Sequence, residues 1–345
     1  MQRASAAESW TSSLKTALLL LSVVVMLTSL VDLFINRLLF RAGPEVLSHM
    51  SFDAGPLAVL GRISLSLEQL VLFAALGIAV LLLLREARGT ARVTGSLLIG
   101  AVACSALLYF PLSEELGWAV STLLVLVAAT LVLVMVFLRA SSSRGLPTRQ
   151  RLTLGVFLAL LLLSFTFPFY YRLYLLAGAI GVVALPGGIQ AYQAGIFSVM
   201  AATVGAFAYA MVAPSPGYSL GVRRFAKAAV LPTIVVAPIA FGLFESYLMT
   251  QIFTLVIAMS TDFALSHDLV QLLAALWWVL LTAALLLVLK GRSSPNKSLI
   301  QEGVGLILLM STTFLFNYPY YIMLGLLGVL LFAYPLRERE EGIAE

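Results

Sequence analysis

Long, unbroken runs of apolar residues dominate this chain of 345 residues, and short polar segments separate them. Apolar and polar positions do not alternate within the runs, so the pattern predicts helices and excludes a β-barrel. Most runs approach the ~20 residues that a helix needs to cross a bilayer. The apolar segments lie at residues 16–36, 66–84, 93–110, 119–138, 152–169, 173–186, 193–213, 229–250, 270–289, 300–317 and 319–335. We therefore predict an all-α protein, a polytopic transmembrane bundle of nine to eleven helices.

Composition places the chain in the same class. The chain is 61% hydrophobic and 11% charged, with a mean hydropathy of +1.04, whereas roughly a quarter of the residues of a soluble protein are charged. The net charge of +5 lies in short loops, so we interpret it as a topology signal and not as a nucleic-acid-binding patch. These features predict a multi-pass protein of the cell membrane, with lipid as its first partner.

The second half of the chain repeats the first. Residues Ser164–Val182 align without a gap on Ser311–Val329, with nine identities in nineteen positions. Such a match indicates an internal duplication. The predicted organisation is an N-terminal part with an extracytoplasmic loop (1–92), a first repeat (93–186), a linking helix (187–227), a second repeat (228–335) and a charged tail (336–345).

The basic loops give conflicting topology signals. By the positive-inside rule, the loops at 139–151 and 214–228 should both be cytoplasmic. However, three predicted apolar segments lie between these loops, and three crossings would place them on opposite sides. Either the tight pair 152–186, with its copy 300–335, does not make two full crossings, or the two halves are inverted and one set of basic loops lies outside.

A pair of aromatic turns is the most distinctive local feature of the repeat. Each turn contains a proline, Pro168 or Pro319, which we expect to break the helix there. Tyrosine is favoured at the headgroup level of a membrane, so we interpret the turns as interfacial anchors. The functional alternative is a pair of gates, or a rim that binds a quinone or lipid. The candidate rim residues are Tyr170, Tyr171, Arg172, Tyr318, Tyr320 and Tyr321.

Acidic residues in apolar runs are the next candidates, because a charge at bilayer depth is costly. Glu245 is the carboxyl that we predict to be deeply buried, either as a proton or cation site or as a hydrogen-bonding group between helices. Asp32 is a second candidate near a helix end. Glu68 and Glu302 also lie at the ends of apolar runs.

The sequence predicts no catalytic residue and no metal site. Its histidines, His49 and His267, both fall in predicted loops, whereas a membrane haem b needs facing histidines on helices. Pro111–Trp118 resembles the paired-glutamate motif of the CAAX-type intramembrane proteases. That family also has a nearby arginine, where this chain has Ala119–Ser121, and two later helical histidines that this chain lacks. We therefore expect no enzyme and no cofactor bound by this chain.

Two functions agree with these features. In length and hydropathy the chain resembles the hydrophobic, haem-free companion of the extracytoplasmic cytochrome b of thermoacidophilic archaea. The resemblance implies a non-catalytic integral subunit of a respiratory chain, which anchors a partner protein that carries the haem. The alternative is a secondary transporter, since transporter folds commonly contain duplicated helical halves.

Overall fold

The described part of the chain is helical throughout, which confirms the predicted all-α class. The computed structural model describes residues 12–30, 56–86, 96, 100, 115–142, 148–179, 187–212, 233–235, 267–293, 298–312 and 320–332. Within these ranges there is no strand, and turns occur only at Gly187 and Thr312. The helices are the N-terminal helix (Ser12–Leu30), α3 (Pro56–Glu86), α5 (Glu115–Ser142), α6 (Thr148–Ala179), α7 (Gly188–Val212), α10 (His267–Ser293), α11 (Ser298–Ser311) and α12 (Tyr320–Phe332).

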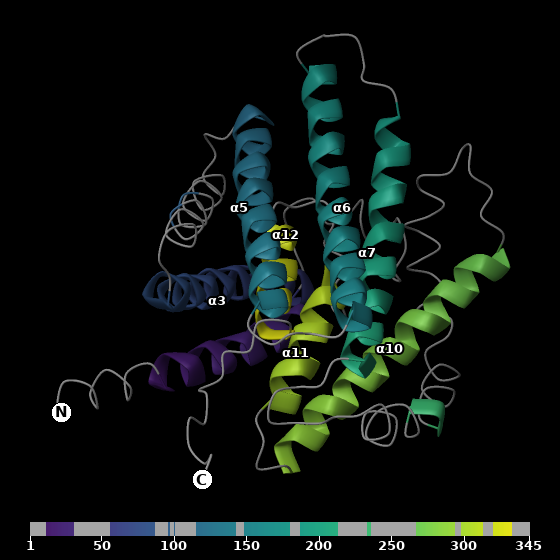
Figure 1. Cartoon of the computed structure of the whole chain (residues 1–345). Coiled ribbons are helices and arrows are strands. Elements are labelled where there is room, and N and C mark those ends of the chain that lie inside the picture. The colour runs from purple at the N-terminus through teal and green to yellow at the C-terminus, as the bar shows by residue number, and fades with distance from the viewer. Residues whose placement is uncertain are drawn as a thin grey trace.

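Three long helices stand side by side. Figure 1 shows α5, α6 and α7 upright, whereas α3 and the N-terminal helix run across the lower part of the view and α10 runs obliquely. Glycines set the close approaches along this row. A Cβ at Gly155 of α6 would lie 3.4 Å from the ring of Phe137 on α5, and one at Gly205 of α7 would lie 3.4 Å from the Cα of Phe157 on α6. Consecutive helices in the row are therefore antiparallel and closely packed.

The first repeat contains one long helix where the sequence predicted two short ones. Helix α6 runs for 32 residues, about 48 Å, straight through Pro168. The expectation that proline breaks the helix at this position is therefore wrong. Proline removes one backbone donor and costs ~3 kcal/mol or more in an ordinary helix. Helix α6 packs against α5 and α7, and such tertiary contacts can override a local propensity. The hydroxyls of Ser164 and Thr166 donate to the carbonyls of Leu161 and Leu163 at 2.6 and 2.7 Å.

The single helix α6 also changes the number of helices between the basic loops. Only α6 and α7 now lie between those loops, and the two helices pack against each other along their length. Thr148, where α6 begins, and Val212, where α7 ends, are consequently at the same end of the molecule (Figure 1). Glycine permits the turn between the two helices, because Gly187 has a φ of 76° and its carbonyl accepts the first hydrogen bond of α7.

The second repeat is folded differently, as two short helices of 14 and 13 residues, α11 and α12. A Cβ built on Gly305 of α11 would lie 2.8 Å from the carbonyl oxygen of Gly328 on α12. Just past the end of α11, Thr312 meets Gly325, which precedes Gly328 in α12. Later residues of α11 therefore meet earlier residues of α12, so the two helices form an antiparallel hairpin in backbone contact.

Helix α12 lies at the centre of the described helices. All its residues from Ile322 to Leu331 are buried, and it packs against α3, α5 and α11. The ring of Phe332 meets Phe157 of α6 at a centroid distance of 6.0 Å, and Gly325 meets Phe165 of the same helix. A helix that is apolar all round, as α12 is, must be enclosed by protein or lipid.

The glycine contacts generate the first prediction. Gly305→Ala or Gly328→Ala would place a methyl carbon against a backbone oxygen, so the helices must separate and lose contacts along the hairpin. We expect a loss of ~1–3 kcal/mol in unfolding free energy, the usual range for overpacking. Thermal unfolding of the purified chain in detergent measures the effect.

Gly77→Ala is the matched control. Gly77 lies inside α3, and a Cβ there would meet nothing within 4 Å. Because alanine has the higher helix propensity, this change should be neutral or stabilising by up to ~1 kcal/mol. Equal destabilisation by all three substitutions would show that α11 and α12 are not in backbone contact.

Candidate functional site

A buried carboxyl joins the first two described helices. The hydroxyl of Ser29, in the N-terminal helix, donates a hydrogen bond to Oε1 of Glu68 in α3. Glu68 is fully buried and Ser29 is 3% exposed. The two residues are 39 positions apart in the chain, so this contact fixes one helix against the other.

The surroundings of this pair are apolar. The residues one helical turn away along each helix are apolar and buried. They are Val25 and Met26, which precede Ser29, and Leu72, which follows Glu68. Helix α12, which packs on α3, carries no charged residue from Tyr320 to Phe332. A carboxyl in such surroundings is costly unless hydrogen bonds stabilise it, which gives the contact with Ser29 its importance.

The structure gives Glu68 a place that the sequence did not indicate. We expected it at the end of an apolar run, and it is instead enclosed between helices. Asp32 and Glu245, the buried polar candidates from the sequence, lie outside the described residues. The signal for Glu68 was an acidic residue inside a long apolar helix, but its partner could not be identified without knowing which face of the N-terminal helix meets α3.

Part of the predicted aromatic rim is visible on α6. Tyr171 stacks on Tyr174 with ring centroids 6.3 Å apart and planes inclined by 17°, and Tyr170 is half-buried beside them. Tyr318 and the side chains of Arg172, Tyr320 and Tyr321 lie outside the described residues. Because α12 is antiparallel to α6, its first residues point toward the end of α6 that carries these tyrosines.

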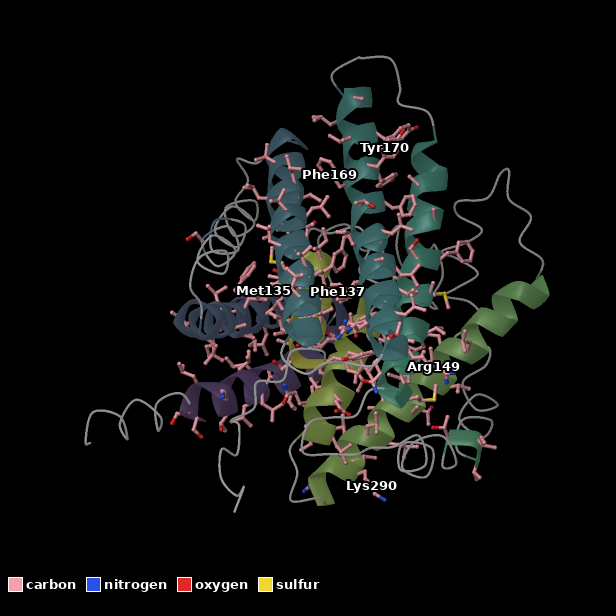
Figure 2. All side chains as sticks on the ribbon, viewed as in Figure 1. Met135, Phe137, Arg149, Phe169, Tyr170 and Lys290 are labelled. Atoms are coloured by element: carbon pink, nitrogen blue, oxygen red, sulfur yellow. The ribbon has the colours of Figure 1, made fainter. Side chains whose placement is uncertain are left out.

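Basic and aromatic residues occupy opposite ends of α6. Arg149 and Arg151 are exposed in its first turn, and Tyr170 follows Arg151 after 19 residues, about 28 Å of helix. That length matches the ~30 Å hydrocarbon core of a bilayer. Figure 2 shows Arg149 and Lys290 toward one end of the molecule and Phe169 and Tyr170 toward the other. The arrangement is the one expected of a spanning helix with a basic end and an aromatic end.

Most buried hydroxyls with a described hydrogen bond act within their own helix. Ser22, Ser198 and Thr203 donate to the carbonyl four residues earlier at 2.7, 2.8 and 2.9 Å. Ser311 does the same at 2.9 Å, and Thr312 donates to a carbonyl three residues earlier at 2.6 Å. These bonds satisfy polar groups locally inside an apolar interior. Among the described residues, no group of three or more His, Cys, Asp or Glu side chains could hold a metal ion.

The pair generates a second prediction, with an internal control. Ser29→Ala removes the hydroxyl that donates to a buried carboxyl, so we expect a loss of ~1–2 kcal/mol in unfolding free energy. Ser22→Ala removes a hydroxyl of the same helix that is equally buried but bonds only to the carbonyl of Leu18, and should cost less than ~0.5 kcal/mol. Thermal unfolding in detergent compares the two. Equal losses would contradict a special role for the contact with Glu68.

Comparison with known proteins identifies no relative of this chain. No protein-family model, characterised protein or solved structure matches this chain. The functional argument therefore depends on the residues and their geometry.

Proposed function

We propose that this chain is a multi-pass membrane protein of nine to eleven helices that serves as a non-catalytic subunit and anchors a partner protein. The partner that the length and hydropathy favour is an extracytoplasmic cytochrome b of an archaeal respiratory chain. In this proposal, haem belongs to the partner and this chain supplies the attachment to the membrane.

The observation that carries the membrane assignment is the apolar outer face of the helices. On α6 the exposed residues Leu152, Val156 and Leu163 recur at spacings of four and seven, which places them on one side of the helix. Helix α3 exposes Leu70 and Leu81 in the same way. Aligned apolar faces of this extent are not left in water by soluble proteins, and lipid is the solvent that suits them.

Two helices meet the length and composition needed to cross a bilayer. They are Ser12–Leu30 and the Thr148–Gly178 part of α6. The other spans of the proposed bundle are inferred from the apolar runs of the sequence. Arg149 at the start of α6 and Lys290 near the end of α10 lie toward the same end of the molecule (Figure 2). Basic residues gathered at one end support a cytoplasmic location for the basic loops.

The packed centre supports an anchoring role over a transport role. Side chains such as Met323, Leu327 and Leu330 fill the space around α12, and the ring of Tyr209 on α7 meets Phe332 at 6.0 Å. A secondary transporter binds its substrate near the bilayer midplane between repeats. An apolar, closely packed centre is suited to holding helices together.

Purification of the native complex tests this proposal. Extracted in a mild detergent, the chain should co-migrate with a second protein, and the complex should show a Soret band. The chain purified alone should show none, because neither His49 nor His267 lies on a predicted facing helical pair. A Soret band that the isolated chain retains, and loses in His267→Ala or His49→Ala, would disprove the division of roles.

A second function has one observation in its favour. Glu68 is a buried carboxyl between two helices, and ionisable residues at such positions often belong to proton or cation pathways. If the chain is an anchor, Glu68→Gln should leave folding and partner binding intact, because glutamine has the shape of glutamate and an oxygen that accepts the hydrogen bond from Ser29. For a proton-coupled transporter, the same variant would lose proton movement while staying folded.

Vesicles with an internal pH-sensitive dye separate the two functions. We expect no proton movement from the reconstituted wild-type chain beyond that of empty vesicles. Proton movement that is present in wild type and in Ser22→Ala, but lost in Glu68→Gln, would replace the anchor with the transporter.

A further inference from the structure

The two copies of the repeated sequence have different conformations. In the first copy, the nineteen matched positions begin at Ser164 in the middle of α6, and the helix continues to Ala179. In the second copy, the match begins at Ser311, the last residue of α11, and includes the whole first part of α12. One sequence pattern therefore lies within a continuous helix in one place, whereas in the other it contains the end of one arm of a hairpin and most of the second arm.

The positions of the prolines explain which copy bends in this structure. Pro319 immediately precedes Tyr320, where α12 begins. A proline there restricts the residue before it and favours a helix start directly after it. In the first copy the corresponding residue is Arg172, and the proline lies four positions earlier in the alignment, at Pro168. The helix passes through Pro168 with one backbone hydrogen bond missing, so α6 is weakest at that point.

The far part of α6 also carries a glycine that the continuous helix does not use. Gly178 is exposed, and a Cβ there would meet nothing within 4 Å. Its counterpart Gly325 is buried in the hairpin, where a Cβ would lie 2.9 Å from the ring of Phe165 and 3.2 Å from Thr312. The glycine is necessary for close packing in the hairpin and has no such role in the continuous helix.

The part of α6 beyond Pro168 is less buried than its counterpart in the second repeat, although Ala177 is buried and Phe169 and Tyr171 pack against the core. Tyr170, Leu173 and Leu176 are only half-buried, in contrast to the fully buried α12. The first half of α6 presents an exposed apolar face, which includes Val156 and Leu163, along which a returning segment could pack.

We propose that α6 interconverts between the continuous helix and a hairpin bent near Pro168, in which residues 173–179, the counterpart of the first part of α12, fold back as α12 does against α11. The proposal depends on the nineteen-position match and not on the identity of the partner. Such a bend moves part of one repeat relative to the other, a kind of movement on which duplicated membrane proteins rely.

Distances between two spin labels test the bend. In a Cys104→Ser background, labels on Val156→Cys and Leu176→Cys are 20 residues apart, about 30 Å along a continuous helix. In a hairpin with the register of α11 and α12, Leu176 would lie opposite residue 163, seven residues from Val156. With helix axes ~8–10 Å apart, the labels would then be about 14 Å apart. We expect the wild-type chain to show both a long and a short distance.

Two substitutions that copy a residue of the second repeat into the first should shift the balance between the continuous helix and the hairpin in opposite directions. Pro168→Leu, which introduces the residue found at Leu315, should remove the short distance. Arg172→Pro, which introduces the residue found at Pro319, should increase it. A label pair on α5, Val120→Cys and Leu138→Cys, provides the control, because α5 contains no proline and should give one distance of about 27 Å in every variant.

The outcomes decide the proposal in either direction. A short-distance fraction that falls in Pro168→Leu and rises in Arg172→Pro, with the α5 distance unchanged, supports it. A single long distance in both the wild type and Arg172→Pro, or a short fraction that Pro168→Leu leaves unchanged, overturns it. If Arg172→Pro does not fold, the comparison of the wild type with Pro168→Leu still decides.

Discussion

Backbone contact at glycine is the constraint on which the rest of this structure depends. Gly303 of α11 approaches the backbone of α10 so closely that a Cβ would lie 2.8 Å from the carbonyl oxygen of Ala284, and Gly305 on the opposite side of α11 has the same separation from Gly328. Helix α11 is thereby held between α10 and α12. In lipid the hydrophobic effect does not drive helices together, so small residues that allow close van der Waals packing take over that role. With α11 fixed in this way, α12 occupies the centre, where α3, α5, α6 and α7 contact it.

Much of the fold follows from the apolar runs alone, because a long apolar run in lipid has to be a helix. The runs predicted at 119–138, 193–213 and 270–289 correspond to α5, α7 and α10. The runs at 93–110 and 229–250 lie almost wholly outside the described residues, and the duplication itself stays a prediction. The break predicted at Pro168 was wrong, since the packing of α6 against α5 and α7 overrides the local propensity. Proline at 319 agrees with the prediction, since α12 begins directly after it.

The candidate site was harder to predict than the fold. An acidic residue in an apolar run is visible in the sequence, but its burial depends on which neighbours cover it. Glu68 and Glu302 looked alike at the ends of their runs, yet Glu68 is fully buried between helices whereas Glu302 is partly exposed on α11. The hydrogen bond from Ser29 links residues far apart in the chain, and such pairing requires knowledge of the packing. Tyr170 and Tyr171 lie near the end of α6 opposite its arginines, and their role as interfacial anchors stays a prediction.

The account as a whole requires that the outer apolar faces meet lipid, and collision accessibility of spin labels tests this most directly. In a Cys104→Ser background, single labels would replace Leu152, Val156 and Leu163 on the exposed face of α6, with Phe157 and Leu161 as buried references on the same helix. In reconstituted bilayers, labels at the three exposed positions should collide readily with molecular oxygen, which dissolves in lipid, and rarely with a water-soluble nickel complex. Labels at the buried positions should be protected from both. Ready collision of the exposed positions with the nickel complex would place this face in water and contradict the membrane account.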